Sequence, residues 1–248
     1  MTLPIALQLY TVRDETAKDF IGTMEKVAAM GYAGVEFAGF GDVPAAKMRA
    51  ALGRLGLKAA GSHTGLDLLR DRLDEVIEYN LEIGNKYVVC PWATYQTKED
   101  YINMAKFLEQ TGVKCREKGL QLAYHNHDFE FNSFDGEYAL DILYRETSPG
   151  NLAAEIDTCW VFYAGVDPVG YIEKYNGRCP LIHLKDLKEK GEKEFIEVGD
   201  GVIDITAIAG AAEKAGAQWL IVETDICPRP TLESAKISLE NLKRMKLV

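Results

Sequence analysis

The chain has 248 residues, and its 38 Asp and Glu residues outnumber its 28 Lys and Arg residues, giving a formal net charge of −10. This acidic balance argues against a nucleic-acid-binding protein, which needs a basic face for phosphates, and against binding to anionic membrane surfaces. The longest apolar runs are strand-sized, so we expect no membrane-spanning helix. The five cysteines include no CxxC pair, and the N-terminus lacks the basic region of a secretory signal. Together these features predict reduced thiols and a cytoplasmic location.

One unit recurs along the chain: a short apolar run, then a turn and an amphipathic stretch. These runs predict eight strands, at residues 5–9, 34–37, 58–62, 87–90, 121–125, 153–157, 181–185 and 220–224. Between them, apolar residues spaced about 3.6 positions apart predict helices, for example at 20–30, 68–83 and 101–118.

Short apolar strands that alternate with helices predict a parallel sheet that is buried on both faces. Eight such units in a chain of this length are typical of the α/β class with a single closed (β/α)8 TIM barrel, which we expect to span residues 1–248 as one domain. An open doubly wound sheet is the alternative. Neither GxGxxG nor GxxxxGK[ST] follows any predicted strand, so the sequence favours the barrel.

Polar residues gather at the carboxyl ends of the predicted strands, where barrel enzymes have their active sites. All four histidines and three carboxylates lie at these ends: Glu36, His63, His125, His127, Asp157, His183 and Glu223. One histidine in such a place is more often a hydrogen-bonded structural residue than a ligand. So many of them at one mouth predict a divalent-cation site instead, because mixed imidazole and carboxylate ligands suit Mn²⁺, Co²⁺ or Zn²⁺.

The sixth, seventh and eighth strands are neighbours in the predicted barrel, so Asp157, His183 and Glu223 are predicted to bind one ion and leave positions open for a substrate. Side chains alternate along a strand, which places Glu155 on the same face as Asp157 but deeper. There we expect an ion pair inside the barrel rather than a metal ligand. Lys185 ends the seventh strand, where it is placed to meet a substrate oxygen or a phosphate.

Aromatic residues and a glycine-containing segment also follow strand ends. Tyr10, Trp92, Phe129 and Trp160 are predicted to line a polyol site together, because sugars stack their C–H faces on aromatic rings, although packing would explain each of them alone. The segment 199–201 (Gly-Asp-Gly) follows the seventh strand, where barrels often hold phosphate. Two glycines are better explained by a tight turn.

Six short motifs, in their order along the predicted strands, resemble the xylose isomerase-like TIM barrels, a family of sugar phosphate isomerases and epimerases. They are QLYTVRD (8–14), GVEFAG (34–39), YHNHDFEF (124–131), EIDTCW (155–160), LIHLKD (181–186) and IVETD (221–225). The resemblance covers essentially the whole chain, and members of the family include ketose 3-epimerases, hydroxypyruvate isomerase and inosose dehydratase.

The resemblance implies one divalent metal ion, held by Glu, Asp, His and Glu from strands five to eight. Asp157, His183 and Glu223 match the last three, but the fifth strand carries YHNH (124–127) where the first Glu is expected. His125 is therefore predicted as the fourth ligand. Mn²⁺ is the predicted ion, with Co²⁺, Mg²⁺ or Zn²⁺ as alternatives. The histidine-bearing fifth strand is more similar to that of inosose dehydratases.

The chemistry that the resemblance implies is removal of a proton next to a carbonyl while the metal polarises the oxygen. The epimerases use two glutamates as acid and base. Here Glu223 matches one, and a histidine must replace the other, which needs little tuning because its ordinary pKa is about 6.5. His127 is predicted for this role, with His125 as the alternative if it is not a ligand. Glu36 and His63 would then orient substrate hydroxyls.

The predicted function is a divalent-metal-dependent isomerase or epimerase of a small sugar, keto-polyol or sugar phosphate. An inosose-dehydratase-like lyase is an alternative, because it shares the proton abstraction and then expels a hydroxyl. A non-catalytic sugar-binding subunit is another, because the fifth strand departs from the family pattern. A DNA-repair endonuclease is opposed by the net charge of −10. The expected partner is a small molecule rather than nucleic acid or membrane. The sequence leaves open whether the protein forms a homo-oligomer.

Overall fold

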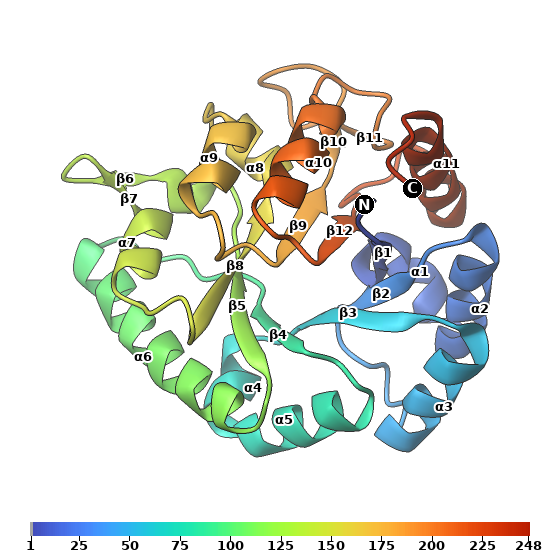
Figure 1. Ribbon diagram of the computed structural model, residues 1–248, viewed down its shortest axis with the longest axis horizontal. Coiled ribbons are helices and arrows are strands. Elements are labelled where there is room, and N and C mark those ends of the chain that lie inside the picture. The colour runs from blue at the N-terminus through green and yellow to red at the C-terminus, as the bar shows by residue number, and fades with distance from the viewer. Residues whose placement is uncertain (1) are drawn as a thin grey trace.

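In the computed structural model, which describes residues 2–248, eight parallel strands close into a barrel that helices surround (Figure 1). In barrel order the strands are β1 (Ile5–Gln8), β2 (Gly34–Phe37), β3 (Lys58–His63), β4 (Tyr87–Cys90), β5 (Gln121–His125), β8 (Leu152–Asp157), β9 (Leu181–Leu184) and β12 (Trp219–Val222), and β12 pairs with β1. The predicted closed (β/α)8 barrel is confirmed. Each strand lies within two residues of its predicted bounds.

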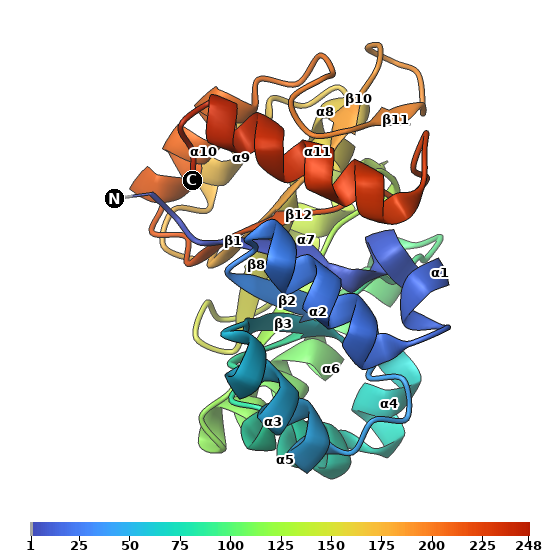
Figure 2. The same cartoon turned by 90° about the vertical axis from the view of Figure 1, so that its right-hand side faces the viewer.

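Helices cover the outside of the barrel. They are α1 (Arg13–Thr16), α2 (Phe20–Met30), α3 (Ala45–Leu55), α4 (Leu66–Asp71), α5 (Leu73–Glu82), α6 (Lys98–Glu117), α7 (Ala139–Arg145), α8 (Thr158–Tyr163), α9 (Pro168–Lys174), α10 (Ile205–Lys214) and α11 (Thr231–Arg244), with 3₁₀ turns η1 (Leu9–Val12) and η2 (Phe129–Phe131). Figure 2 shows α2 and α11 side by side, so helices from opposite ends of the chain close the outer ring. Two hairpins are added, β6 (Ser133–Phe134) with β7 (Glu137–Tyr138), and β10 (Asp186–Leu187) with β11 (Phe195–Ile196).

Two predicted helices differ from the observed ones at identifiable residues. The predicted helix at 68–83 is divided into α4 and α5, because Arg72 has non-helical backbone angles of φ −138° and ψ 33°. The predicted helix at 101–118 begins earlier, at Lys98, because the Thr97 side chain accepts the backbone N–H of Asp100 and caps the first turn. Within residues 2–248, no helix combines the length and apolar character needed to cross a bilayer.

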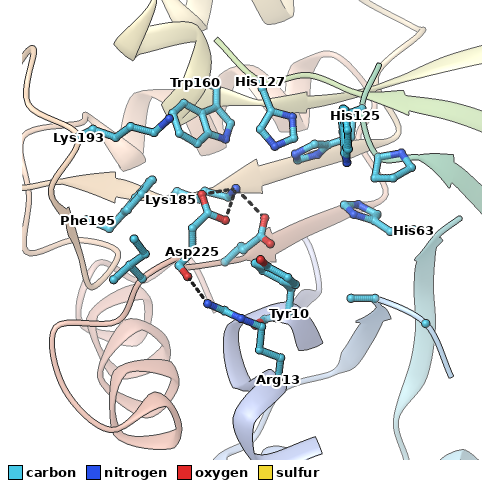
Figure 3. A pocket seen from close by; sticks show the side chains of 16 residues that line it. Tyr10, Arg13, His63, His125, His127, Trp160, Lys185, Lys193, Phe195 and Asp225 are labelled. Carbon is cyan, nitrogen blue, oxygen red and sulfur yellow. Dashed lines mark hydrogen bonds and ion pairs between the residues drawn. The ribbon is translucent and has the colours of Figure 1, made fainter. Parts of the chain in front are cut away.

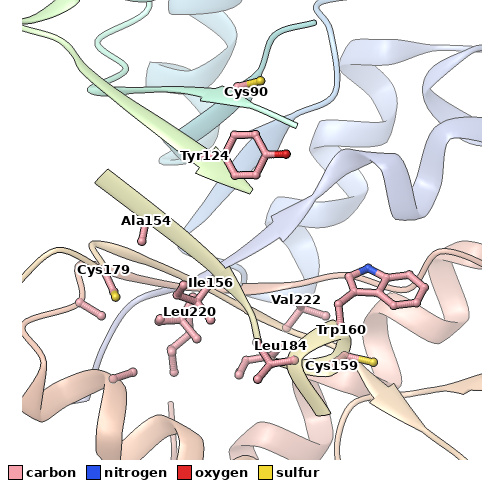
Figure 4. Close-up of a cluster of buried hydrophobic side chains, with 14 of the residues drawn as sticks. Cys90, Tyr124, Ala154, Ile156, Cys159, Trp160, Cys179, Leu184, Leu220 and Val222 are labelled. Atoms are coloured by element: carbon pink, nitrogen blue, oxygen red, sulfur yellow. The ribbon is translucent and has the colours of Figure 1, made fainter. Parts of the chain in front are cut away.

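Alternation of side chains along the strands divides the core in two. Outward residues such as Ala154 and Ile156 of β8 pack beneath the helices (Figure 4). A smaller inward cluster lies toward the amino ends of the strands and consists of Ala6, Ala60, Val89, Ala123, Ala153, Leu181 and Ile221. Tyr87 and Trp219 pack against this inner cluster. Farther along the same strands the inward side chains become polar, which brings the chemistry to the opposite end of the barrel.

Candidate active site

A cavity of about 710 Å³ opens at the carboxyl ends of the strands (Figure 3). This volume suits a small-molecule ligand. Of the predicted site residues, those that line it are Tyr10, His63, Trp92, His125, His127, Trp160, Lys185 and Glu223. Trp92 and Tyr10 are 54% and 42% exposed, whereas Trp160 is buried. These three aromatic residues therefore divide into an exposed pair at the rim and a buried side chain on the wall.

Four side chains from consecutive strands converge beside this cavity. His125, Asp157, His183 and Glu223 are all buried, and their potential ligand atoms lie within 4.8 Å of one another. His183 Nδ1 lies 3.0 Å from Glu223 Oε2, and His125 Nε2 lies 3.6 Å from Asp157 Oδ2. These are the four residues predicted as ligands. Two imidazoles and two carboxylates form a donor set that suits a divalent transition metal.

The carboxylate of Asp157 is fixed by the helix that follows it. Its Oδ1 accepts the backbone N–H groups of Cys159 and Trp160, each at 3.0 Å, and so caps the start of α8. Its Oδ2 is buried and has no aligned hydrogen-bond partner among the described residues. The Lys185 ammonium lies 3.0 Å from this oxygen, so its position suits a positive charge.

A layer of carboxylates beneath the four residues orients the two imidazoles. His125 Nδ1 lies 2.9 Å from Glu155 Oε1, and His183 Nε2 lies 2.7 Å from Glu36 Oε2. Histidines that bind metals commonly donate their other ring N–H to a carboxylate. These contacts leave His125 Nε2 and His183 Nδ1 facing Asp157 and Glu223.

The deeper group formed by His63, His125, Glu155 and His183 also has ligand atoms within 4.8 Å of one another. Its members are already paired, since Glu155 Oε1 lies 2.7 Å from His63 Nε2 as well as 2.9 Å from His125 Nδ1. Glu155 therefore has the internal ion-pair contacts expected from its depth in β8. The group that includes Asp157 and Glu223 is the better candidate for a metal, because it offers two carboxylates with its two imidazoles, whereas the deeper group offers one carboxylate.

Glu36 faces the barrel interior by ordinary alternation, because Val35 and Phe37 on either side of it pack in the outer core. The pairing of β2 with β3 is irregular beside it: Val35 pairs with Ala59 and Glu36 with Gly61, so the extra residue of the bulge lies in β3. Gly61 stands opposite, where an added Cβ would lie 2.2 Å from Glu36 Oε1. Glu36 is fully buried and is not among the residues that line the cavity. It therefore contacts His183 and His63 rather than the space that would hold a substrate.

Burial and charge separate the protonation states of the histidines. Burial alone would lower the pKa of His63, but Glu36 and Glu155 outweigh it and raise that pKa to about 10. The same two carboxylates, against the effect of burial, raise the pKa of His183 well above its ordinary value. Burial, with the neighbouring His183 and His63, holds the pKa of His125 well below its ordinary value. Without a metal, His63 and His183 are therefore charged at neutral pH and His125 is neutral, so His183 has to release a proton when it binds a metal.

His127 lies on the wall of the cavity above His125. Burial first, and Lys185 second, lower the pKa of its imidazole to about 3, so the ring is neutral at physiological pH. The ring stacks on Phe129, with centroids 5.3 Å apart and an interplanar angle of 8°. Its Nδ1 is buried without a hydrogen-bond partner among the described residues.

Lys185 is almost completely buried and contacts three carboxylates at the floor of the cavity. Its Nζ lies 2.7 Å from Glu223 Oε2, 3.0 Å from Asp157 Oδ2 and 3.1 Å from Asp225 Oδ1. Burial alone would lower the pKa of this ammonium, but Asp157 and Glu223 outweigh it and hold the pKa well above its ordinary value. Sequence reasoning missed Asp225, although the signal was available: it lies two residues after Glu223, on the same face.

Sequence reasoning also missed two cationic side chains at the mouth. The Arg13 guanidinium donates to the carbonyl oxygens of Tyr10 and Asp225 at 2.8 and 2.9 Å and lies 4.1 Å from the Tyr10 ring centroid. Lys193, from the β10–β11 hairpin, lies 4.3 Å from the Trp160 ring centroid. Within residues 2–248, neither forms an ion pair with a carboxylate. The mouth thus presents two positive charges that no carboxylate of the described residues neutralises.

The segment 199–201 forms a turn whose N–H groups are already bound. The Asp186 carboxylate accepts the backbone N–H groups of Gly199 and Gly201, each at 3.0 Å, and that of Ile203 at 3.1 Å. An added Cβ on Gly201 would lie 2.3 Å from Asp186 Oδ1. The expected tight turn is present, and a side-chain carboxylate occupies the place where a phosphate would bind.

Solved structures share the fold of this chain. A sugar phosphate isomerase/epimerase from Parabacteroides distasonis ATCC 8503 superposes with a TM-score of 0.84 at 22% identity, covering 100% of this chain and 96% of that one. A structure of the IOLI protein with a bound zinc atom has a TM-score of 0.77 at 16% identity, covering 100% and 97% of the two chains. At these identities the likeness shows the fold alone.

Sequence comparison identifies closer relatives. The inosose dehydratase of Geobacillus kaustophilus (strain HTA426) is 27% identical over 247 residues, which covers 83% of this chain and 80% of the relative. The inosose dehydratase of Lacticaseibacillus casei is 29% identical over 149 residues, and the match spans 49% of that relative, about half its length. The model of the family described as xylose isomerase-like TIM barrel matches residues 24–246. The chain therefore belongs to the xylose isomerase-like TIM-barrel family.

Proposed function

We propose that the protein is a divalent-metal-dependent isomerase or epimerase that acts on a small sugar, keto-polyol or sugar phosphate. The observation that carries this proposal is the buried group of His125, Asp157, His183 and Glu223, whose potential ligand atoms lie within 4.8 Å of one another beside the cavity. Membership of the xylose isomerase-like family supports the same class of chemistry.

The metal would be held by His125 Nε2, Asp157 Oδ2, His183 Nδ1 and Glu223 Oε2. A bound divalent cation supplies Lewis-acid polarisation of a substrate oxygen beside the reacting carbon. Two imidazoles and two carboxylates suit Mn²⁺, which is our preferred ion, and they also suit Zn²⁺. The zinc atom in the IOLI structure supports zinc as the alternative.

Glu223 and His127 are the proposed acid/base pair, since both line the cavity. Burial would raise the pKa of Glu223, but Lys185 and His183 outweigh it and lower that pKa, so the carboxylate is ionised at neutral pH. It is the proposed acceptor of the proton from the carbon next to a carbonyl. The neutral imidazole of His127 donates its N–H to a substrate oxygen or exchanges a proton there. His125 is a poor shuttle, because one ring nitrogen faces Asp157 and the other is bound to Glu155.

The cavity walls support a polyol with an anionic group. Trp160, Trp92 and Tyr10 offer ring faces for sugar C–H groups, and Arg13 and Lys193 offer positive charge that no carboxylate of the described chain neutralises. Guanidinium and ammonium groups bind phosphates and carboxylates through charge-assisted hydrogen bonds. A sugar phosphate is therefore the preferred member of the proposed substrate class.

An inosose-dehydratase-like lyase is the second candidate. The curated relatives with this name favour it, and so does His125, which stands where the epimerases have a glutamate. Both candidates begin with removal of a proton next to a carbonyl. They differ in the next step, in which a lyase loses a hydroxyl as water and an epimerase returns the proton to carbon.

The metal site is tested by elemental analysis of purified variants. We expect one equivalent of metal in the wild type and none in Asp157→Ala or His183→Ala. Asp167→Ala is the matched control, because Asp167 caps α9 as Asp157 caps α8, accepting N–H groups from Val169 and Gly170. It reports the loss of a helix cap alone and should retain metal. Stoichiometric metal in both Asp157→Ala and His183→Ala would refute the assignment.

The reaction is tested by solvent deuterium incorporation and product mass across ketoses, their phosphates and inososes. Incorporation without loss of water indicates isomerisation or epimerisation, whereas loss of water indicates the lyase. We expect Glu223→Gln and His127→Asn to reduce incorporation about 10²–10⁴-fold while metal stays bound in His127→Asn. Undiminished exchange in both variants would contradict the acid/base assignment, and tight sugar binding without exchange in the wild type would support a non-catalytic role.

A further inference from the structure

The ammonium of Lys185 lies in the same place as the carboxylates of the candidate metal group. We propose that Lys185 is a built-in counter-cation that holds the Asp157–Glu223 carboxylate pair when no metal is bound, and that Asp225 retains it when a metal takes that pair. This inference rests on the proposed metal site and adds a residue that sets how tightly the site binds its ion.

The lysine and a metal would compete for the same oxygen atoms. Asp157 Oδ2 and Glu223 Oε2 are the oxygens that face the ring nitrogens of His125 and His183, at 3.6 and 3.0 Å. They are also the oxygens nearest Lys185 Nζ, at 3.0 and 2.7 Å. Asp157 cannot bind a metal through one oxygen and the ammonium through the other, because its Oδ1 already caps α8. A divalent ion and an ammonium on these two oxygens would repel each other, so one displaces the other.

Besides its hydrogen bond to Glu223, the ammonium is bound to a third carboxylate. Lys185 Nζ donates hydrogen bonds to Asp225 Oδ1 at 3.1 Å and Oδ2 at 3.3 Å (Figure 3). Its approach to Asp157 Oδ2 is close but poorly aligned, since that oxygen has no hydrogen-bond partner among the described residues. Asp225 does not belong to either candidate metal group. Lys185 can therefore release the ligand pair while it stays bound to Asp225.

Asp225 is itself held in position for this role. The Arg13 guanidinium donates to its carbonyl oxygen at 2.9 Å, which ties the loop after β12 to the loop after β1. The Asp225 side chain retains 21% exposure, whereas those of Lys185 and Asp157 retain 1% and none. Movement of the ammonium toward Asp225 is thus movement toward the cavity, where the charge becomes available to a substrate oxygen.

The test is Mn²⁺ binding to metal-free protein, measured by calorimetric titration. Removing the competing charge in Lys185→Met should tighten Mn²⁺ binding about tenfold or more, because like charges in contact are costly. Asp225→Asn should weaken it about tenfold, because the lysine loses its alternative partner and stays on the ligand pair. In the double variant, the effect of Asp225→Asn should largely disappear, since it acts through the lysine.

Lys193→Met is the matched control, because it removes the same charge from the lining of the same cavity without touching a carboxylate. It should change Mn²⁺ affinity less than about threefold, as expected of an exposed charge. Lys185→Met should also melt at a lower temperature without metal, since three carboxylates lose their counter-cation. Saturating Mn²⁺ should then raise its melting temperature more than that of the wild type. If Lys185→Met does not fold, Asp225→Asn alone tests the inference. Weaker Mn²⁺ binding in this variant supports it, and equal or tighter binding contradicts it.

Each outcome separates this inference from the proposed function. Equal or weaker Mn²⁺ binding in Lys185→Met, or unchanged binding in Asp225→Asn, overturns the role of Lys185 while the metal site stands. Binding by Lys185→Met but not by the wild type supports the inference and overturns metal dependence of the natural protein. Absence of Mn²⁺ and Zn²⁺ binding in both overturns the two together.

Discussion

The two ends of the barrel interior are built from the same strands but have opposite chemistry. Along five of the eight strands, an inward apolar residue is followed two positions later by an inward polar one: Ala6 by Gln8, Ala123 by His125, Ala153 by Glu155, Leu181 by His183, and Ile221 by Glu223. The step is one repeat of the strand period. A distance of two residues therefore separates the part of the barrel that stabilises the fold from the part that is available for chemistry.

The difference in stability between the ends follows from what each end buries. The amino end buries small apolar side chains beneath Trp219 and Tyr87, which is favourable. The carboxyl end buries polar atoms without hydrogen-bond partners among the described residues, namely Glu36 Oε1, His127 Nδ1, Glu155 Oε2, Asp157 Oδ2 and Trp160 Nε1. Each such atom costs free energy of folding. The mouth is thus arranged for binding at the expense of stability, and the amino end offsets that cost.

The largest expected effect is at the amino end. Leu181→Ala removes a fully buried side chain from the inner cluster and should lower the free energy of unfolding by about 2–5 kcal/mol. Urea denaturation measures this loss. Trp92→Ala, at the exposed rim, should change the free energy of unfolding by less than about 0.5 kcal/mol. If Leu181→Ala lost metal without losing stability, the amino end would serve metal binding rather than stability, contrary to this assignment.

A buried carboxylate near the mouth should make stability depend on pH. Burial raises the pKa of Glu130 from 4.5 to about 8, although Tyr124 donates to its Oε1 at 2.7 Å and the His127 N–H donates to its Oε2 at 2.8 Å. The folded pKa is raised, so the unfolded chain releases this proton first as pH increases. The contribution of Glu130 to stability is therefore complete below pH 4.5 and is lost as pH rises toward 8.

Glu130→Gln should remove this dependence. We expect the wild type to lose about 2–4 kcal/mol relative to the variant between pH 5 and pH 8.5, measured by urea denaturation at each pH. The variant can keep its hydrogen bonds, because the Tyr124 hydroxyl has a second acceptor in the Ala93 carbonyl at 3.2 Å. Parallel pH profiles for the two proteins would mean that Glu130 is ionised in the folded state throughout this range.

The carboxylates beneath the metal group should set its affinity without touching the ion. In Gly61→Ala the new Cβ would lie 2.2 Å from Glu36 Oε1, so Glu36 must move away from His183. Loss of such an orienting contact typically weakens metal binding by about 10–100-fold. Gly53→Ala is the matched control, since an added Cβ there has no atom within 4 Å. Equal Mn²⁺ affinity in the two variants would show that Glu36 does not orient His183.

The comparison of the two ends also explains how much the sequence could predict. The eight strands follow from short apolar runs, and the grouping of Asp157, His183 and Glu223 follows from their places at the ends of neighbouring strands, both of which a sequence displays directly. The choice of His125 as the fourth ligand needed the family resemblance as well. The contact of Glu36 with His183, at 2.7 Å, crosses the barrel interior between strands that are not neighbours, and no pattern in the residues marks such a pairing.

The loops were the least predictable part of the site. Arg13 follows a 3₁₀ turn, and Lys193 lies in a hairpin whose strands are two residues long. Neither segment is long enough to show the periodic apolar pattern of a helix or strand. Their positions depend on contacts between segments far apart in the chain, such as Arg13 with the carbonyl of Asp225. The ion pair of Lys185 with Glu223 is also of this kind, because it joins neighbouring strands rather than neighbouring residues. Such contacts need the fold before they can be inferred.

The smallest expected effect is at the rim, where Arg13 is exposed to solvent. Its guanidinium is preorganised by two backbone carbonyls and the Tyr10 ring, which favours anion binding, but solvent and salt screen an exposed charge. An exposed ion pair contributes about 0.2–1 kcal/mol, so Arg13→Met should weaken binding of fructose 6-phosphate only about two- to fivefold. Binding of fructose should not change, because fructose lacks the anionic group, and the effect on binding of the phosphate should diminish as the salt concentration is raised.

Arg54→Met is the matched control, since Arg54 pairs with Glu25 on the outer surface and does not line the cavity. Equal losses for the two sugars would mean that Arg13 packs against the ligand rather than binding its charge, and the positive rim would then have no part in selecting a phosphorylated substrate.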